Sequence, residues 1–108
     1  MSNRVVVTGM GVLSPIGLTL ESYWDALCAG RSGIGPITKF DVTDFSSKIA
    51  GELKGFIATD HLDRKEVRRM DEFVQYAVVA TRMALEDSGL DLEGEDKERI
   101  GVVLGSGV

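Results

Sequence analysis

Few residues of this chain could do chemistry on their own. Cys28 is its only cysteine and His61 its only histidine, and they lie far apart in the sequence. Cys28 also falls on the apolar stripe of a predicted helix, where a buried cysteine behaves as a small hydrophobic residue. We therefore interpret Cys28 as structural and His61 as an ordinary residue of the surface or of a helix start. Neither a histidine metal site nor a Ser-His-Asp triad has its other members in view, so we assign no catalytic residue and no metal ligand.

A glycine pattern near the N-terminus offers a second kind of chemistry. Gly9-x-Gly11-x-x-Ser14 follows an apolar run, as in dinucleotide-binding loops. Such a loop must open directly into a helix whose N-terminus meets the pyrophosphate, whereas Pro15 and Gly17 intervene here. We interpret the glycines as a tight turn. A stand-alone nucleotide-binding α/β domain is kept as an alternative, which an affinity measurement with NAD or ATP would test.

A basic cluster is the most unusual charged feature. Arg64, Lys65, Arg68 and Arg69 lie close together in a chain whose net charge is -5. Like charges four residues apart destabilise a helix by a few tenths of a kcal/mol per pair. The cluster is either a solvated helix face or a docking surface for an acidic partner, where charge steers the encounter.

A second glycine motif, Gly105-Ser106-Gly107, follows an apolar run near the C-terminus. The carboxyl end of a buried strand is where open α/β sheets place ligand crevices. The same residues also suit a simple glycine turn. The sequence leaves both interpretations open.

Composition limits the possible classes. The acidic net charge argues against nucleic acid or an anionic membrane as the main partner. A single cysteine cannot form an internal disulfide, which fits a reducing compartment. We find neither a signal-peptide apolar region nor an apolar stretch that could span a bilayer, so a cytoplasmic location is expected.

The strands that would position these residues are predicted from apolar patterning. Residues 4–8 and 100–104 are apolar runs without alternation, which is typical of strands buried on both faces. A weaker alternation predicts a strand within residues 48–53. Residues 31–36 are predicted as a loop, and residues 91–99 as a charged connection.

A first helix is predicted over residues 20–29. Thr19 can cap its start and Gly30 can end it. Apolar side chains recur at helical spacing along one stripe. The stripe consists of Leu20, Tyr23, Trp24, Leu27 and Cys28.

A second helical region follows. Asp63 as N-cap and Glu66 three residues later form a predicted capping box. The helix is expected to break near Asp71 and to run to Ser88, where Gly89 ends it. Its later half carries a face of mostly small residues, which would allow close packing. This face consists of Phe73, Ala77, Ala80, Thr81, Ala84 and Ser88.

Together these elements predict an α/β chain of the order β-α-(irregular)-β-α-β. Two strands buried on both faces need more cover than two helices supply. We therefore expect residues 1–108 to be an incomplete domain, the N-terminal piece of something larger.

Several blocks of sequence stand out together, in order along the chain. They are residues 5–17, Trp24-x-x-Leu27-x-x-Gly30-x-Ser32-Gly33-Ile34, Phe40-Asp41, Ala50-Gly51-Glu52, residues 64–76 and Arg99-Ile100-Gly101-x-x-x-Gly105-Ser106-Gly107. These blocks resemble the N-terminal part of β-ketoacyl-[acyl carrier protein] synthases, most closely the synthase II branch. The resemblance extends over essentially the whole chain.

This resemblance implies the first half of a thiolase-like layered α/β fold, a homodimer and an acyltransferase of fatty acid biosynthesis. The implied reaction is a decarboxylative Claisen condensation that extends an acyl thioester with malonyl-acyl carrier protein, without a cofactor. The family's nucleophilic cysteine and two histidines lie in motifs later than residue 108. Cys28 and His61 do not match them and inherit no role.

The resemblance does assign binding residues. Lys65, Arg68 and Arg69 match basic positions that contact acyl carrier protein, and Arg64 is adjacent. Val108 matches a position that lines the acyl pocket near the dimer interface. A non-catalytic relative of the chain-length-factor type stays an alternative, and the residue at the later nucleophile position would distinguish it.

Overall fold

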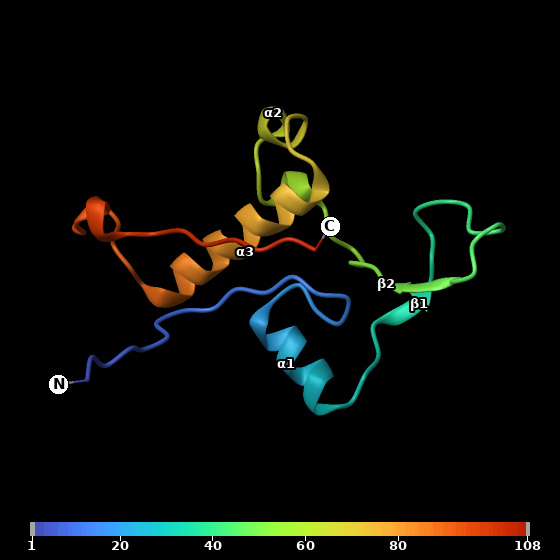
Figure 1. Cartoon of the computed structure of the whole chain (residues 1–108), viewed down its shortest axis with the longest axis horizontal. Coiled ribbons are helices and arrows are strands. Elements are labelled where there is room, and N and C mark those ends of the chain that lie inside the picture. The colour runs from blue at the N-terminus through green and yellow to red at the C-terminus, as the bar shows by residue number, and fades with distance from the viewer. Residues whose placement is uncertain (1, 108) are drawn as a thin grey trace.

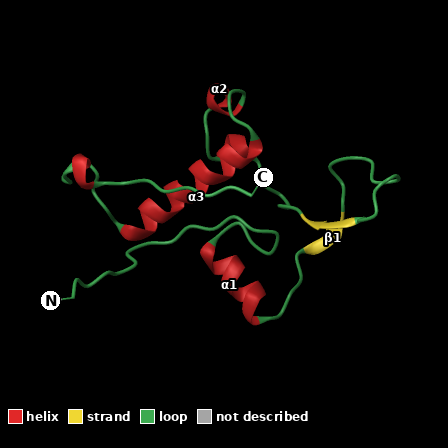
Figure 2. Ribbon diagram, viewed as in Figure 1, coloured by secondary structure: helices red, strands yellow, loops and turns green. Residues whose placement is uncertain are grey.

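The longest helix, α3 (Glu72–Ser88), crosses the middle of the molecule in the computed structural model, which describes residues 2–107 (Figure 1). Helices and very short strands alternate with long irregular segments (Figure 2). The other elements are α1 (Leu20–Cys28), β1 (Ile34–Pro36), β2 (Ile49–Gly51), the 3₁₀ turn η1 (Ala58–Asp60), α2 (Arg64–Val67) and the 3₁₀ turn η2 (Lys97–Arg99).

The ends of α3 follow local signals in the sequence. Asp71 is the extended N-cap residue, so the predicted break near this position is confirmed. Gly89 ends the helix in the left-handed region, with φ of 66°. Glycine adopts this conformation without a steric penalty, which makes it the usual helix terminator. The predicted end of the second helix is therefore confirmed as well.

The N-terminal segment lies against the small-residue face of α3. A β-carbon on Gly9 would stand 2.5 Å from the backbone nitrogen of Ser88, and one on Gly11 would stand 2.8 Å from that of Ala84. Neither glycine has a positive φ. The predicted tight turn is therefore wrong for these positions, because their missing side chains serve close backbone packing instead.

The turn lies a few residues later and leads into α1. Ser14 and Gly17 exchange two backbone hydrogen bonds, of 2.9 and 3.2 Å. Thr19 then caps α1 through a capping box with Ser22, and Gly30 follows the helix with φ of 66°. The prediction for α1 is confirmed to within one residue. No helix opens at the glycines, so the geometry of a dinucleotide-binding loop is not formed.

The apolar stripe of α1 is largely uncovered. Trp24 is 62% exposed, Leu27 is also exposed, and the buried residue of this helix is Ala26. Cys28 is exposed too, so the expectation that it is a buried hydrophobic residue is wrong for this chain. The stripe has the spacing of a buried face, but residues 2–107 place little against it.

The two strands form an antiparallel pair on an arm at the right of Figure 1. Gly35 pairs with Ala50 at the centre of the pair. β2 lies within the predicted strand of residues 48–53, whereas β1 lies in a segment predicted as a loop. Lys54 supports the arm by donating from Nζ to the carbonyl of Gly33 at 2.8 Å.

The two buried strands predicted for residues 4–8 and 100–104 do not form. Both segments are irregular chain without strand pairing (Figure 2). Val5 is 92% and Val103 is 97% exposed. The prediction is wrong for residues 2–107, because a strand forms only against a hydrogen-bonding neighbour and is buried only under covering layers.

The described chain buries little. Its buried apolar residues are Ala26, Leu62 and Val79. The Cα radius of gyration is 17.1 Å, whereas a compact domain of 100 residues has about 13 Å. No helix within residues 2–107 has both the length and the hydrophobicity needed to cross a bilayer.

Candidate functional site

The basic cluster lies on and directly after α2, a helix of only four residues. The predicted capping box is confirmed. Asp63 Oδ1 accepts a hydrogen bond from the backbone N–H of Lys65 at 3.1 Å, and Glu66 Oε2 accepts one from the N–H of Asp63 at 3.3 Å. These bonds satisfy donors that a helix N-terminus would otherwise leave unpaired. They fix where the helix begins.

Arg64 and Lys65 belong to α2, Arg68 is its C-cap residue, and Arg69 follows. We call these side chains the basic α2 surface. All four are exposed, and none forms an ion pair within residues 2–107. Their charges are therefore available to a partner from outside the chain.

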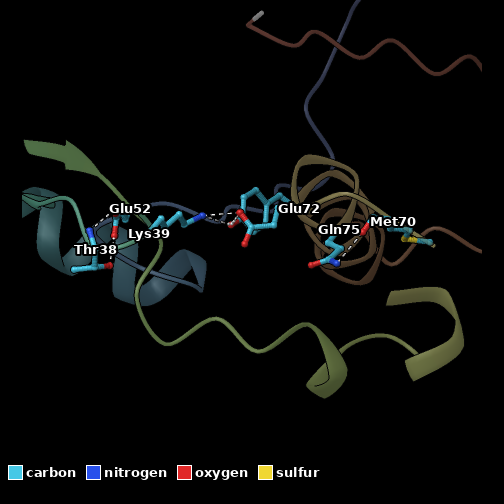
Figure 3. Close-up of polar contacts among 7 residues, drawn as sticks. Thr38, Lys39, Glu52, Met70, Glu72 and Gln75 are labelled. Carbon is cyan, nitrogen blue, oxygen red and sulfur yellow. Dashed lines mark hydrogen bonds and ion pairs between the residues drawn. The ribbon is translucent and has the colours of Figure 1, made fainter. Parts of the chain in front are cut away.

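Gln75 of α3 holds the end of α2. Its Nε2 donates to the carbonyl oxygen of Met70 at 3.1 Å and to that of Val67 at 3.3 Å (Figure 3 shows the Met70 bond). The last carbonyls of a helix have no partner within the helix. Val67 is the last residue of α2, and its carbonyl also accepts from the Met70 N–H at 3.3 Å, whereas Met70 itself follows the helix. The amide of Gln75 therefore bonds the chain where it turns from α2 into α3.

Arg82 of α3 holds the start of the same segment. Its Nη1 donates to the carbonyl oxygen of His61 at 2.9 Å, and its Nη2 lies 4.0 Å from Glu66 Oε2. Arg82 thus balances the one acidic side chain within α2. The ion pair of Glu66 is therefore made by Arg82 and not by the basic side chains of the cluster.

A hollow of about 330 Å³ lies at this surface. Its walls bring Lys65 and Arg69 together with Asp63 and Glu66. Arg64 and Arg68 do not line it. The predicted residues thus form one short exposed surface, and two of them share a concave site.

A hydrogen-bonded group fixes the start of α3 (Figure 3). Lys39 Nζ donates to Glu72 Oε2 at 2.6 Å, and the Tyr76 hydroxyl donates to the same oxygen at 3.3 Å. The bond from Lys39 lowers the pKa of Glu72 below its ordinary 4.5, and the same bond raises the pKa of Lys39 above 10.5. This group ties the arm of β1 and β2 to the helix that carries Gln75 and Arg82.

Cys28 and His61 do not form a catalytic pair. No hydrogen bond within residues 2–107 joins them. His61 is exposed, as expected, and its ring stacks on Phe56 with centroids 5.6 Å apart. Its contribution to the surface is its backbone carbonyl, which accepts from Arg82.

A second hollow, of about 450 Å³, lies between α3 and the C-terminal segment. Phe73, Ala77 and Val78 line one side, and Leu104 and Gly105 line the other. The motif at residues 105–107 forms no turn in the structure. Val108, assigned to an acyl pocket by resemblance, lies outside the described residues.

Sequence reasoning missed Gln75 and Arg82. Both lie on α3 and are separated by two helical turns, so they share one face of the helix. This spacing is the only signal in the sequence that could have assigned Gln75 and Arg82 to one common role. Their partners are mostly backbone carbonyls, which no residue type marks.

The family assignment rests on the whole chain. Residues 2–108 match the family model described as beta-ketoacyl synthase, N-terminal domain. The chain belongs to the beta-ketoacyl synthase N-terminal domain family. This confirms the resemblance that the ordered blocks predicted. The basic α2 surface is thus a feature of a beta-ketoacyl synthase domain.

Comparison with individual relatives agrees with this family assignment. The chain is 54% identical over 105 residues to a 3-oxoacyl-[acyl-carrier-protein] synthase 2 of Vibrio cholerae, covering 97% of this chain and 25% of that protein. It is 50% identical over 107 residues to the synthase 2 of Staphylococcus aureus, covering 99% of this chain and 26% of that protein. This beta-ketoacyl synthase domain therefore spans about a quarter of the length of these relatives.

A solved structure supports the fold. The ishigamide ketosynthase/chain length factor aligns with a TM-score of 0.74 and 42% identity, over 82% of this chain and 22% of that one. The predicted fold class, the N-terminal part of a thiolase-like α/β fold, is confirmed. The chain is therefore an α/β protein with the fold of the beta-ketoacyl synthases.

Proposed function

We propose that this chain is the N-terminal part of a condensing acyltransferase of fatty acid biosynthesis, a 3-oxoacyl-[acyl carrier protein] synthase. The observation that carries the proposal is the identity of 50% or more to synthases of that name. In the proposed reaction, malonyl-acyl carrier protein loses CO₂ and its carbanion attacks an acyl group held on a cysteine. The cysteine thiolate leaves, and the product is a 3-oxoacyl-carrier extended by two carbons.

The catalytic cysteine and histidines are proposed to lie beyond residue 108, so this chain supplies binding residues. We propose that the basic α2 surface receives the acidic helix of acyl carrier protein. Exposure and the absence of ion pairs to these side chains within residues 2–107 support this role. So does the contrast with the net charge of -5. Charge complementarity of this kind speeds association and selects the partner.

Charge reversal in the full-length synthase tests this function. Arg68→Glu combined with Arg69→Glu should raise KM for carrier-bound substrates, and the effect should weaken as salt rises. Turnover of a small thioester without the carrier should stay unchanged. Arg99→Glu is the matched control, because Arg99 is also exposed and basic but lies in η2, at the opposite end of α3 from α2 (Figure 1). Equal losses with both substrates would contradict the docking role.

We further propose that Val108 lines the acyl pocket, as the resemblance implies. Its neighbours give indirect support, since Gly105 and Ser106 border an apolar hollow against α3. We also propose that the full-length protein forms a homodimer and is cytoplasmic. We propose finally that residues 1–108 are an incomplete part of its first half-domain. The exposed apolar runs at residues 4–8 and 100–104 support the last of these.

A non-catalytic chain-length-factor role is the second candidate, because the structural neighbour bears that description in its name. The two candidates differ at the nucleophile. Mass spectrometry of the full-length protein after incubation with an acyl-carrier donor should detect a covalent acyl adduct on an enzyme. A chain-length factor without the cysteine would stay unmodified.

A further inference from the structure

We infer that Gln75 and Arg82 are positioning residues that hold the basic α2 surface in its docking conformation. The inference rests on the proposed function of that surface and adds two residues that do not belong to it. Both come from α3, and each holds one end of the segment that carries the basic side chains.

The segment needs such support because α2 is too short to be stable alone. Helix nucleation is unfavourable, and isolated helices shorter than ~12–15 residues are marginal in water. α2 has four residues. Its basic side chains also repel one another at helical spacing. The capping box fixes the first turn but does not join the segment to the rest of the chain.

The hydrogen bonds from α3 make that join at two points. Gln75 binds the carbonyl of Val67, the last residue of α2, and that of Met70, which follows the basic side chains. Arg82 binds the carbonyl of His61, before the cap. A helix that fixes both points fixes the path of the chain between them. A surface ordered before binding loses less conformational entropy when its partner docks.

Arg82 has a second effect on the charges. It lies 4.0 Å from Glu66, the acidic residue within α2. Pairing Glu66 with α3 reduces its competition with an acidic partner for the basic side chains. Gln75 has no charge, so its variants separate positioning from electrostatics.

Gln75→Leu in the full-length synthase tests the inference, because leucine has a similar size and cannot donate to the carbonyls. We expect KM for acyl carrier protein substrates to rise about threefold to tenfold, as for lost preorganisation of a few groups. The small-thioester kcat should be unchanged. Glu86→Gln is the matched control, since Glu86 is also on α3, is exposed and forms no ion pair within the described residues.

Salt dependence distinguishes positioning from charge. Carrier protein affinity, measured by fluorescence anisotropy, should fall in Gln75→Leu by a similar factor at every salt concentration, because no charge is removed. In the Arg68 and Arg69 reversal the loss should shrink with salt. The Arg82→Lys variant keeps the positive charge, so its affinity for acyl carrier protein should be higher than that of Arg82→Met. If Gln75→Leu does not fold, Gln75→Asn, whose amide is one methylene shorter, should show the same rise in KM.

The outcomes separate the two proposals. A wild-type KM in the Gln75 variants, together with a raised KM in the Arg68 and Arg69 reversal, would overturn the positioning role and leave the docking role intact. No effect of that reversal would overturn the docking role itself. A loss of small-thioester turnover in Gln75→Leu equal to the loss with the carrier would show that Gln75 acts on the fold as a whole, which also contradicts the inference.

Discussion

Gly11 lies against the backbone of Ala80, so closely that a β-carbon on Gly11 would overlap the Ala80 carbonyl oxygen. Gly11→Ala should therefore push the N-terminal segment away from α3. Overpacking of this kind costs typically ~1–3 kcal/mol of unfolding free energy. Chemical denaturation of the full-length protein would measure the loss. Gly35→Ala is the control and should change stability little, because Gly35 has no positive φ and no atom of the described residues lies within 4 Å of a β-carbon there.

The pair of Lys39 and Glu72 predicts a pH dependence. The pKa of Glu72 is lowered in the folded chain by the hydrogen bond from Lys39, so its contribution is present above pH 4.5 and is lost as pH falls through the folded pKa. The pKa of Lys39 is raised by the same bond, so that contribution is present below pH 10.5 and is lost as pH rises through the folded pKa. Both side chains are exposed, and such pairs contribute only ~0.2–1 kcal/mol.

NMR titration of the carboxyl groups checks this prediction. Lys39→Met should return the pKa of Glu72 toward its ordinary value. Asp41 is an internal control, because hydrogen bonds from the Thr43 hydroxyl and backbone lower its pKa. Its titration should not move. A Glu72 pKa that is the same in both proteins would show that the ion pair does not persist in solution.

Removal of the thiol at Cys28 should have little effect on the reaction. Cys28 matches no motif of the proposed nucleophile, and no hydrogen bond joins it to His61 within residues 2–107. Because the apolar stripe of α1 is expected to be covered in the full-length protein, the loss of stability should be that of a small core change. Cys28→Ala in the full-length synthase should keep both condensation and covalent acylation, the latter followed by mass spectrometry. An unacylated Cys28→Ala protein would make Cys28 the nucleophile.

The polypeptide of residues 1–108 alone should be poorly folded and prone to aggregation. It exposes the apolar runs of residues 4–8 and 100–104, and unpaired apolar chain of high β-propensity invites pairing between molecules. Sedimentation and binding of a hydrophobic dye would measure this, and no condensing activity is expected. A soluble monomer with a cooperative thermal transition would contradict the prediction.

Val108→Phe tests the acyl-pocket role by substrate length. A packed apolar wall tolerates overfilling poorly, whereas one methylene changes discrimination by only ~1–3 kcal/mol. Activity of the full-length synthase with long acyl primers should fall much more than with the shortest primer. Equal losses at all lengths would show that Val108 does not line the path of the acyl tail.

Local signals were sufficient to predict the helices. The structure confirms three helix boundaries that these signals predicted. Thr19 caps the start of α1, the capping box of Asp63 and Glu66 starts α2, and Gly89 ends α3. The reason is that capping depends on a few adjacent residues. The basic α2 surface was predictable for the same reason, because its members are close in sequence.

Features that depend on distant parts of the chain were predicted poorly. The strand propensity of residues 4–8 and 100–104 is real, but a strand also needs a neighbour that the described residues do not provide. Gly9 and Gly11 looked like turn residues because a pattern cannot show which helix will lie beside them. Gln75 was missed since its partners are backbone carbonyls.

The contact between the N-terminal segment and α3 also has a consequence for the order of folding during synthesis. Met10 N donates to Asp87 Oδ2 across 77 positions, whereas Gln75 reaches its partners across 5 and 8. Short loops close at a lower entropic cost and earlier than long ones. At a synthesis rate of ~5–20 residues per second, the apolar residues made first wait roughly 4–15 s for the helix they pack against. During that interval they lack the helix that they pack against in the folded chain.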